Sequence, residues 1–463
     1  MVHQYKLAGR SLVLDTNSGS LHQVDDLAYD AIARYKTRTQ EEIVTELLAL
    51  YGHMPDVDRN EISALLEDHI AALESAGQLF SPDVYQTLAT GIGQTHGEYK
   101  AMCLHMAHTC NLACAYCFAG ANQSHGEAAL MPFEIGKAAL DFLLSHSGTR
   151  KNLEVDFFGG EPLLNWDVVK DLVAYGRTQE KKWDKLFRFT LTTNGVGLTD
   201  EIMDFANREM ETVVLSLDGR KSIHDRFRKT PDGRGSYDTV VPKFQELVRR
   251  RGGKGYYIRG TFTRHNLDFT EDILHMADLG FTELSMEPVV CPPDAPYALT
   301  EAHLPELFAQ YERLAAEMEL RNQTGQSFRF YHYTLDLDHG PCAHKRLVGC
   351  GVGTEYLAVT PSGAFFPCHQ FVGESKYTMG DVWQGVTNSA VAAELADCNV
   401  YTRPACHDCW AKLYCSGGCA ANAYHTSGDL RGIDAYGCTL FKKRLECALA
   451  LKAAGSNKEH AEI

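Results

Sequence analysis

The chain has 463 residues, of which 44% are hydrophobic and 22% charged, so it can bury a large core and is not a disordered polypeptide. Its 44 basic and 60 acidic residues give a formal charge of −16, which argues against a nucleic-acid-binding surface or attachment to anionic membranes. The N-terminal residues contain no apolar segment typical of a secretory signal, and no apolar run is long enough to span a membrane. We therefore expect a cytoplasmic protein.

The first 90 residues have the pattern of a small separate module. Short apolar stretches at 5–7, 11–14 and 21–24 alternate with turn signals, which predicts a small antiparallel sheet. Apolar spacings near 3.6 residues predict helices at 41–51 and 58–76. Together these elements predict a winged-helix-like module over residues 1–90. Because the module lacks a basic stripe, we expect an exposed strand edge to bind a peptide rather than DNA.

Residues 99–305 alternate between strand and helix patterns. A helix is predicted at 133–145, and strands are predicted at 102–105, 153–158, 187–192, 212–216, 256–262 and 284–290. Six such units predict an α/β fold in which a parallel sheet curls into a partial, TIM-like (β/α)6 barrel. Active sites of such sheets lie at the carboxyl ends of the strands. Beyond the barrel we expect a bridging region at 306–340, a cysteine-dense domain at 341–447 and a tail at 448–463.

The 15 cysteines are unevenly distributed. Nine lie between Cys342 and Cys438, and three form the group Cys110, Cys114 and Cys117. In a reducing compartment such clustering favours metal ligation or redox catalysis over disulfides. The first group follows the first barrel strand, so its thiols are expected at the catalytic rim. Three thiolates hold a [4Fe–4S] cluster with one iron open to a small molecule; the alternatives are a zinc site or buried cysteines without a ligand role.

The spacing C-x3-C-x2-C, with the aromatic Tyr116 before the last cysteine, resembles the motif of the radical S-adenosylmethionine (SAM) superfamily. The resemblance implies that the open iron binds the amino and carboxylate groups of SAM. One electron would then split SAM into methionine and a 5′-deoxyadenosyl radical, which abstracts hydrogen. Cys110, Cys114 and Cys117 would hold this catalytic cluster.

Further elements of the same family stand at successive strand ends. The sequence Gly159-Gly160-Glu161-Pro162 looks like the GGEP element, where glycines let the backbone approach a ligand and the carboxylate suits the methionine ammonium. The segments that follow the next two strands look like the ribose and carboxylate contacts of the family. The SAM contacts that the resemblance implies are Tyr116, Gly159, Gly160, Glu161, Pro162, Thr193, Asn194, Ser216, Asp218 and Arg228, with Glu287 as a weaker candidate.

The second cysteine group resembles the SPASM extension of radical enzymes that modify peptides: Cys350, Gly363 and Cys368 are followed by C-x2-C-x5-C-x3-C and a last cysteine. The resemblance implies two auxiliary [4Fe–4S] clusters, three clusters in all. The outer one would be held by Cys406, Cys409, Cys415 and Cys438, and the inner one by Cys350, Cys368 and Cys419. The fourth inner ligand is either Cys342 or a substrate thiolate. Zinc ribbons are the alternative for this region. Four cysteines fit no ligand spacing and are expected to be ordinary core or surface residues: Cys103, Cys291, Cys398 and Cys447.

The order of small module, radical barrel and SPASM domain resembles maturases of ribosomally made peptides, in which the front module recognises a leader. Four segments, 1–6, 14–19, 333–342 and 367–373, look like the thioether-forming maturases of six-cysteine (SCIFF) peptides. The resemblance implies intramolecular Cys thioether crosslinks of sactionine or ranthipeptide type, often to Thr, in a cysteine-rich precursor peptide. It also implies a low-potential electron donor such as ferredoxin or flavodoxin, and neither a nucleic-acid nor a membrane partner.

Two other functions remain open. One is that of an anaerobic sulfatase maturase, which makes formylglycine; in that group an aspartate base follows the second inner-cluster cysteine, where this chain has His369. The other is a non-catalytic, peptide-binding zinc scaffold. The presence of all three cysteines of the first group argues against the scaffold.

Overall fold

The computed structural model describes residues 1–92, 97–117, 129–337 and 342–459. Residues 338–340 of the predicted bridging region, the predicted start of the SPASM domain at residue 341 and the end of the predicted tail lie outside the described residues. None of the described helices is long and apolar enough to cross a membrane.

The N-terminal region forms a three-stranded antiparallel sheet in the order β1-β2-β3, followed by helices. A capping box between Thr39 and Glu42 starts the second helix. The helix predicted at 58–76 is divided by a π-helical stretch, η1, while Ile62, Leu66 and Ile70 stay buried. The elements are β1 (Val2–Leu7), β2 (Arg10–Asp15), β3 (Leu21–Val24), α1 (Asp26–Tyr35), α2 (Gln40–Tyr51), α3 (Arg59–Ala64), η1 (Leu65–Ile70), α4 (Ala71–Ser75) and α5 (Tyr85–Ile92).

The small sheet joins two hydrophobic cores. Because side chains alternate along a strand, Val13 of β2 packs with the helices of the module, whereas Leu12 and Leu14 belong to the core that also contains the barrel. On β1, the ring of His3 stacks on Trp410 with 3.6 Å between centroids. The N-terminal module is therefore packed onto the remainder of the chain and is not a freely moving appendage.

The six predicted barrel strands are present and parallel, and the sheet continues beyond both of its ends. A seventh parallel strand, β10, pairs with β9, and β11 pairs in parallel with β4. The strand predicted at 284–290 ends two residues earlier, at Pro288. The strands are β4 (Ala101–Ala107), β5 (Asn152–Gly159), β6 (Leu186–Thr193), β7 (Met210–Ser216), β8 (Tyr256–Phe262), β9 (Glu283–Pro288) and β10 (Arg329–Phe330).

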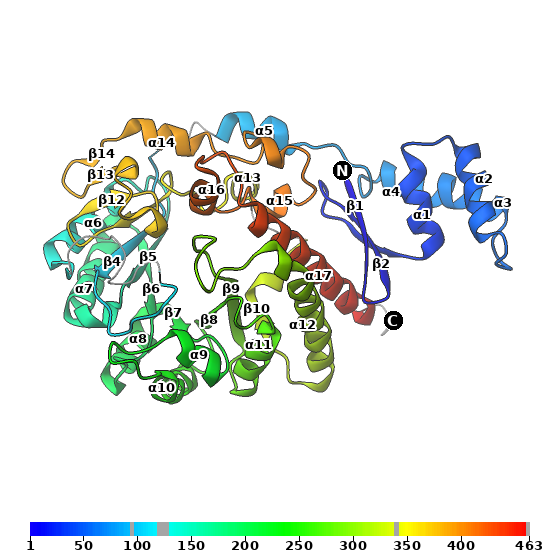
Figure 1. The fold of residues 1–463 in the computed structure, drawn as a ribbon. Coiled ribbons are helices and arrows are strands. Elements are labelled where there is room, and N and C mark those ends of the chain that lie inside the picture. The colour runs from blue at the N-terminus through cyan, green and yellow to red at the C-terminus, as the bar shows by residue number, and fades with distance from the viewer. Residues whose placement is uncertain (93–96, 118–128, 338–341, 460–463) are drawn as a thin grey trace.

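Helices cover the outer face of this curved sheet (Figure 1). On β6, Phe187, Phe189 and Leu191 are buried in the core, which leaves Thr190 and Thr192 facing the inside of the barrel, here called the lumen. The helices are α6 (Phe133–Ser145), η2 (Pro162–Asn165), α7 (Trp166–Trp183), α8 (Asp200–Glu209), α9 (Lys221–Phe227), α10 (Tyr237–Arg250), α11 (Phe269–Asp278), η3 (Glu301–His303), α12 (Leu304–Thr324) and η4 (Tyr331–Tyr333).

The cysteine-dense region extends the barrel sheet through β11 and three antiparallel strands. Its last helix, α17, passes residue 447 without a break and lies between the N-terminal module and the barrel (Figure 1). The elements are α13 (Ala343–Val348), β11 (Tyr356–Val359), β12 (Ala364–Phe366), η5 (His369–Phe371), η6 (Ser375–Tyr377), β13 (Gly380–Asp381), β14 (Gly385–Val386), α14 (Ser389–Ala396), η7 (Pro404–Cys406), α15 (Lys412–Cys415), α16 (Ala420–Ser427) and α17 (Ala435–Glu459).

A buried carboxylate fastens this region to the barrel. Glu355, just before β11, is 5% exposed and forms ion pairs with Lys100 (2.7 Å) and with Arg150. These cations hold its pKa below the usual carboxyl range, although burial acts in the opposite direction. Its backbone carbonyl also accepts a hydrogen bond from the Lys100 amide, at 2.8 Å. Glu355 therefore joins the first barrel strand to the cysteine-dense region.

Replacing Glu355 by Gln should lower stability by about 1–3 kcal/mol, because two cations lose a buried partner. Since the pKa of Glu355 is lowered in the folded state, its contribution is full above the ordinary carboxyl pKa and is lost as the pH falls through the lowered value. The apparent unfolding temperature of Glu355→Gln should thus lie below that of the wild type at neutral pH and approach it in acid. Asp167→Asn, at a side chain that is 92% exposed, is the control. Equal unfolding temperatures of Glu355→Gln and wild type at neutral pH would contradict the assignment.

Candidate functional site

The three cysteines of the first group lie on a loop directly after β4, at the carboxyl end of the barrel sheet. The loop is held from outside by backbone hydrogen bonds, from Ala113 N–H to Lys229 O at 2.7 Å and from Ala115 N–H to Phe227 O at 3.2 Å. Both acceptors follow or end α9. The loop is thus attached to the segment behind the fourth barrel strand, and its position depends on that contact.

The thiols of this loop lie close enough to affect one another's ionisation. Burial, followed by the charges of Glu161 and Cys117, raises the pKa of Cys110 to about 11. Burial also raises the pKa of Cys114 to about 12, with Arg228 acting against it and Cys117, Asp218 and Cys110 adding to it. Cys110 and Cys114, which resist ionisation on their own, suit the positively charged core of an iron–sulfur cluster, because metal binding deprotonates thiols. The donor set fits the predicted [4Fe–4S] cluster.

The two glycines at the end of β5 allow a close approach between chain segments. Gly160 donates its N–H to Ala107 O at 2.7 Å, and a Cβ on Gly160 would lie 2.1 Å from Thr109 O. Gly159 has φ +115°, which side chains rarely adopt. The contact that requires glycine here is with the segment leading into the cysteine loop. The expectation that these glycines also let the backbone approach a ligand stays a prediction.

Glu161 connects the ends of two barrel strands. Its carboxylate is 1% exposed and accepts hydrogen bonds from Thr193 Oγ1 (2.7 Å) and from the Asn194 amide (2.8 Å). Burial raises its pKa to about 7, against the effect of these hydrogen bonds. The side chain of Asn194 in turn donates to Asn111 Oδ1 at 2.8 Å and to Cys110 Sγ at 3.5 Å. Pro162 starts η2 directly afterwards. The GGEP element and the Thr193-Asn194 pair therefore form one network with the cysteine loop.

A second network surrounds Asp218, which is fully buried. Its carboxylate accepts hydrogen bonds from Arg228 (3.0 Å), from the Thr261 amide (3.0 Å) and from the hydroxyl of Tyr116 in the cysteine loop. Arg228 also lies over the ring of Tyr116, 5.6 Å from its centroid. The sequence suggested that Asp218 accepts from ribose hydroxyls. In the structure Asp218 positions Tyr116 and Arg228, and its contact with ribose stays a prediction.

The two remaining SAM-contact candidates lie differently. Ser216 is the last residue of β7 and stands opposite Arg259 of β8 in the strand register. Glu287 of β9 accepts hydrogen bonds from His332 Nε2 (2.9 Å) and Ser285 Oγ (3.1 Å) inside the barrel. The charges of His332, Arg259 and Arg444 keep the pKa of Glu287 well below its usual range despite burial. Glu287 is therefore a lumen residue whose carboxylate already has partners.

In the cysteine-dense region, four thiols from separate elements come together. Burial, followed by the charges of Cys438, Cys406 and Cys409, raises the pKa of Cys415 to about 12. Burial likewise raises the pKa of Cys438 to about 11, with contributions from Cys406 and Cys409. These are the four residues that the sequence grouped as ligands of the outer cluster.

Three other thiols form a separate group. Burial and the charges of Cys419 and Cys350 raise the pKa of Cys368 well above its usual value, and burial and Cys419 raise that of Cys350. Thus Cys419 belongs with Cys350 and Cys368, although Cys415 is only four residues away in sequence. Cys342 is exposed and is not among the charges that raise the pKa of Cys350 or Cys368. The arrangement fits an inner cluster with three thiol donors.

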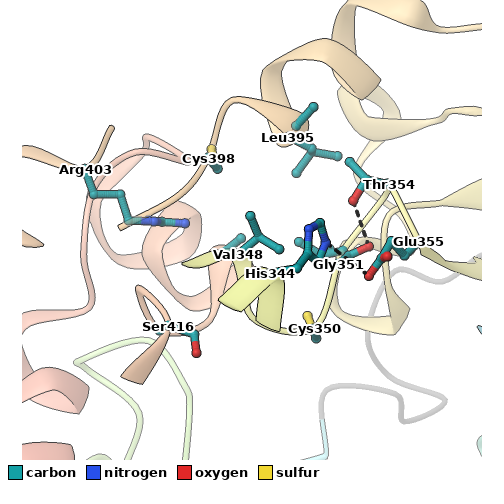
Figure 2. Close-up of a pocket in the computed structure, with 14 residues that line it drawn as sticks. His344, Val348, Cys350, Gly351, Thr354, Glu355, Leu395, Cys398, Arg403 and Ser416 are labelled. Atoms are coloured by element: carbon teal, nitrogen blue, oxygen red, sulfur yellow. Dashed lines mark hydrogen bonds and ion pairs between the residues drawn. The ribbon is translucent and has the colours of Figure 1, made fainter. Parts of the chain in front are cut away.

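A cavity opens beside Cys350 (Figure 2). His344 of α13 points into this cavity, with its Nε2 3.5 Å from Oε2 of Glu355. Arg403 and Ser416 line the opposite side of the cavity. Within the described residues, no group of three or more His, Cys, Asp or Glu side chains is arranged to hold a single metal ion. Of the cysteines without a predicted role, three are buried and one is half-buried: Cys103, Cys398, Cys447 and Cys291.

The inner thiol group lies beside the barrel lumen. His369, next to Cys368, packs against the lumen-facing Phe158 of β5, with 5.2 Å between ring centroids. Burial lowers the pKa of His369 to about 4, and Arg259 of β8 contributes to this shift. The sequence shows that His369 follows Cys368, a predicted cluster ligand. Its contact with Phe158 of the barrel wall could not be predicted from the sequence.

Substituting Asp218 by Asn tests the network at the cysteine loop. Arg228, with a side chain 11% exposed, would lose its buried counter-charge, and breaking such a pair costs about 3–5 kcal/mol. We expect SAM cleavage by anaerobically reconstituted enzyme to fall by at least about tenfold, because part of this cost displaces the loop. Tyr116→Phe, which removes one hydroxyl, should have a smaller effect. Wild-type SAM cleavage and iron content in Asp218→Asn would show that the network does not position the loop.

Comparison with known proteins finds similarity to an iron–sulfur domain and to radical SAM proteins. Residues 95–242, which contain the cysteine loop, match the family model of a 4Fe-4S single cluster domain. The radical SAM cyclopropyl synthase TigE of Paramaledivibacter caminithermalis is 20% identical over 455 residues, which is 92% of this chain and 89% of that protein. A cysteine-type anaerobic sulfatase-maturating enzyme of Clostridium novyi is 22% identical over 68% of this chain and 85% of its own length.

Solved structures share the fold. The structure of anSMEcpe with bound AdoMet and the Kp18Cys peptide matches 77% of this chain and 99% of its own, with a TM-score of 0.63 and 20% identity. Streptococcus suis SuiB bound to its precursor peptide SuiA matches 93% of this chain and 97% of its own, with a TM-score of 0.51 and 15% identity. The chain therefore resembles radical S-adenosylmethionine proteins in sequence and shares the fold of these solved structures, with its cysteine loop at the rim of a partial barrel.

Proposed function

We propose that this chain forms intramolecular Cys thioether crosslinks in a ribosomally made, cysteine-rich precursor peptide. The observation that carries the proposal is the placement of two thiol groups around one lumen. The loop of Cys110, Cys114 and Cys117 lies at the strand ends, and the group containing Cys368 adjoins the same lumen through the contact between His369 and Phe158. A peptide carbon and a peptide thiol held between them would meet both.

The cofactors of this proposal are SAM and three [4Fe–4S] clusters. When bound, they supply a 5′-deoxyadenosyl radical that removes hydrogen from a peptide carbon, and a route for the electron released when sulfur joins that carbon. The chain would hold the first cluster through its loop and the outer one through Cys406, Cys409, Cys415 and Cys438. Gly159, Gly160, Glu161, Asn194 and Arg228 surround the loop where SAM would bind.

The inner thiol group offers three donors, Cys350, Cys368 and Cys419. Because Cys342 is not among the thiols whose charges act on Cys350 or Cys368, we favour a substrate thiolate as the fourth ligand. Such an open position would bind and deprotonate the peptide thiol, since metal coordination removes the thiol proton. The chain would thereby prepare the sulfur that attacks the carbon radical.

The N-terminal sheet is the proposed binding site for the leader of the precursor. Within the described residues β3 pairs with β2 alone, so its outer edge is available to an added strand. Both solved structures named above contain peptides, according to their descriptions. Electrons would come from a low-potential donor such as ferredoxin or flavodoxin.

Formylglycine formation, as in anaerobic sulfatase maturases, is the second candidate function, because one relative has that activity and the fold is shared. His369 stands where that group is expected to carry its aspartate base, and burial lowers the pKa of His369 to about 4. The two functions differ in their products. A thioether consumes a cysteine thiol of the peptide, and formylglycine creates an aldehyde.

The decisive test is mass spectrometry of the cysteine-rich peptide encoded beside the gene, after turnover with SAM and a reductant. Each thioether removes two hydrogens and leaves one cysteine that does not react with iodoacetamide. Cys114→Ala should give unmodified peptide. An aldehyde that reacts with hydrazine, or fully alkylated peptide from the wild type, would contradict thioether formation.

The number of clusters can be measured directly. Anaerobically reconstituted enzyme should contain about twelve iron and about twelve sulfide per chain, since each cubane holds about four of each. Cys409→Ala should lose about four iron and still cleave SAM, whereas Cys114→Ala should lose a similar amount and cleave none. If the wild type contained only about four iron atoms per chain, the proposal of two auxiliary clusters would be wrong.

A further inference from the structure

The strand register places an exposed arginine inside the barrel at the level of the candidate site. On β8, Tyr256, Ile258 and Phe262 are buried in the core beneath the helices, so the alternate residues face the lumen. Arg259 is one of these, and it stands opposite Ser216 of β7 and Ser285 of β9. Ser216 ends its strand, so Arg259 lies near the rim that carries the cysteine loop.

Arg259 is exposed although its neighbours Ile258 and Gly260 are buried. Within the described residues, its guanidinium makes no hydrogen bond or ion pair. The charge nevertheless contributes to lowered pKa values of residues on three other elements, Glu287 on β9, His332 on η4 and His369 on η5. Arg259 of the barrel wall therefore lies near His369, the residue that follows Cys368.

The two carboxyl groups whose pKa values the charge of Arg259 lowers, those of Glu287 and Asp156, form no hydrogen bond or ion pair with its guanidinium within the described residues. Glu287 is already bonded to His332 and Ser285. Asp156 on β5 accepts from Thr192 Oγ1 at 3.1 Å, and burial raises its pKa to about 7, so near neutral pH it is only partly ionised. Five N–H donors of a guanidinium in this position are left for a ligand.

An aromatic pair lies on the same side of the sheet. Tyr257, two residues before Arg259, also faces the lumen, and its ring stacks with Tyr331 of η4 at 6.4 Å between centroids and 15° between planes. Tyr331 is 66% exposed. Arginine and tyrosine are enriched at protein interfaces, where rings supply contact area and the guanidinium binds oxygen atoms. This composition suits a peptide better than an inorganic anion.

We propose that Arg259 and the Tyr257–Tyr331 pair form the site that holds the substrate segment of the peptide within the lumen, with Arg259 donating to main-chain carbonyl oxygens and the rings packing along the chain. The inference rests on the proposed function and extends it from leader binding to binding of the segment that reacts. The site lies between the cysteine loop and the group of Cys350, Cys368 and Cys419. A peptide held there would present one residue to each.

The test compares full-length and leader-only forms of the cysteine-rich peptide encoded beside the gene, bound to anaerobically reconstituted holoenzyme with SAM. Arg259→Gln and Tyr331→Ala should leave leader-only affinity unchanged. Each should weaken full-length binding and raise KM by about tenfold for the arginine and by several-fold for the tyrosine. Because Tyr331 is so exposed, its truncation should not unfold the protein. Both variants should form more 5′-deoxyadenosine per crosslink than the wild type. A loosely held peptide would let more radicals abstract hydrogen without a crosslink being formed.

Two matched controls make the comparison specific. Arg188→Gln removes an exposed guanidinium near the amino end of β6, and Trp383→Ala removes a ring that is 68% exposed on the β13–β14 turn. Both should behave like the wild type. Unchanged full-length binding in Arg259→Gln and Tyr331→Ala would overturn the inference, as would a loss of SAM affinity, which would assign Arg259 to the SAM site. A wild type that binds full-length peptide without crosslinking it would refute the proposed function, while the binding comparison would still decide the role of Arg259.

Discussion

The site depends on holding one short, cysteine-bearing loop against the ends of the barrel strands. The loop has few hydrogen bonds of its own, so buried polar groups of the sheet determine its position. Glu161 joins the ends of β5 and β6, and Asn194 extends that link to Cys110. Asp218 reaches the loop from the other side through Tyr116. Because Asp218 is fully buried, displacing the loop would remove Tyr116 from among the partners of a buried carboxylate, which is costly.

The same constraint explains how distant segments meet at the lumen. Glu355 fastens the cysteine-dense region to the first barrel strand, and β11 continues the barrel sheet by pairing with β4. This attachment brings His369 and the adjacent Cys368 against Phe158 of the barrel wall. On the far side, β1 packs on α17, where the hydroxyl of Tyr5 donates to Glu446 O at 2.8 Å. The N-terminal module, the barrel and the cysteine-dense region are therefore packed against one another.

Local sequence patterns predicted most helices and strands. They did not predict which side chains from distant parts of the chain contact one another. The strand at 256–262 and the helix at 133–145 were predicted with their observed bounds, because apolar residues mark both ends of the strand and recur along one face of the helix. The resemblance also grouped Cys419 with Cys350 and Cys368, which the structure brings together. By contrast, the contacts of Asp218 with Tyr116 and Thr261 could not be predicted, since no spacing shows that these residues would reach it. Arg259 was missed because a lone arginine on a strand becomes informative only when the register places it in the lumen.

The central claim is that a radical formed at the cysteine loop acts on a peptide held in the lumen. It is tested most directly by turnover of precursor peptide carrying deuterium on its threonine and other non-cysteine side chains and Cα positions, followed by mass analysis of the 5′-deoxyadenosine produced. We expect deuterium in 5′-deoxyadenosine in proportion to the crosslinks formed. Crosslinked peptide accompanied by 5′-deoxyadenosine without deuterium would contradict direct hydrogen abstraction from the peptide, and with it the arrangement of loop, lumen and inner thiol group described above.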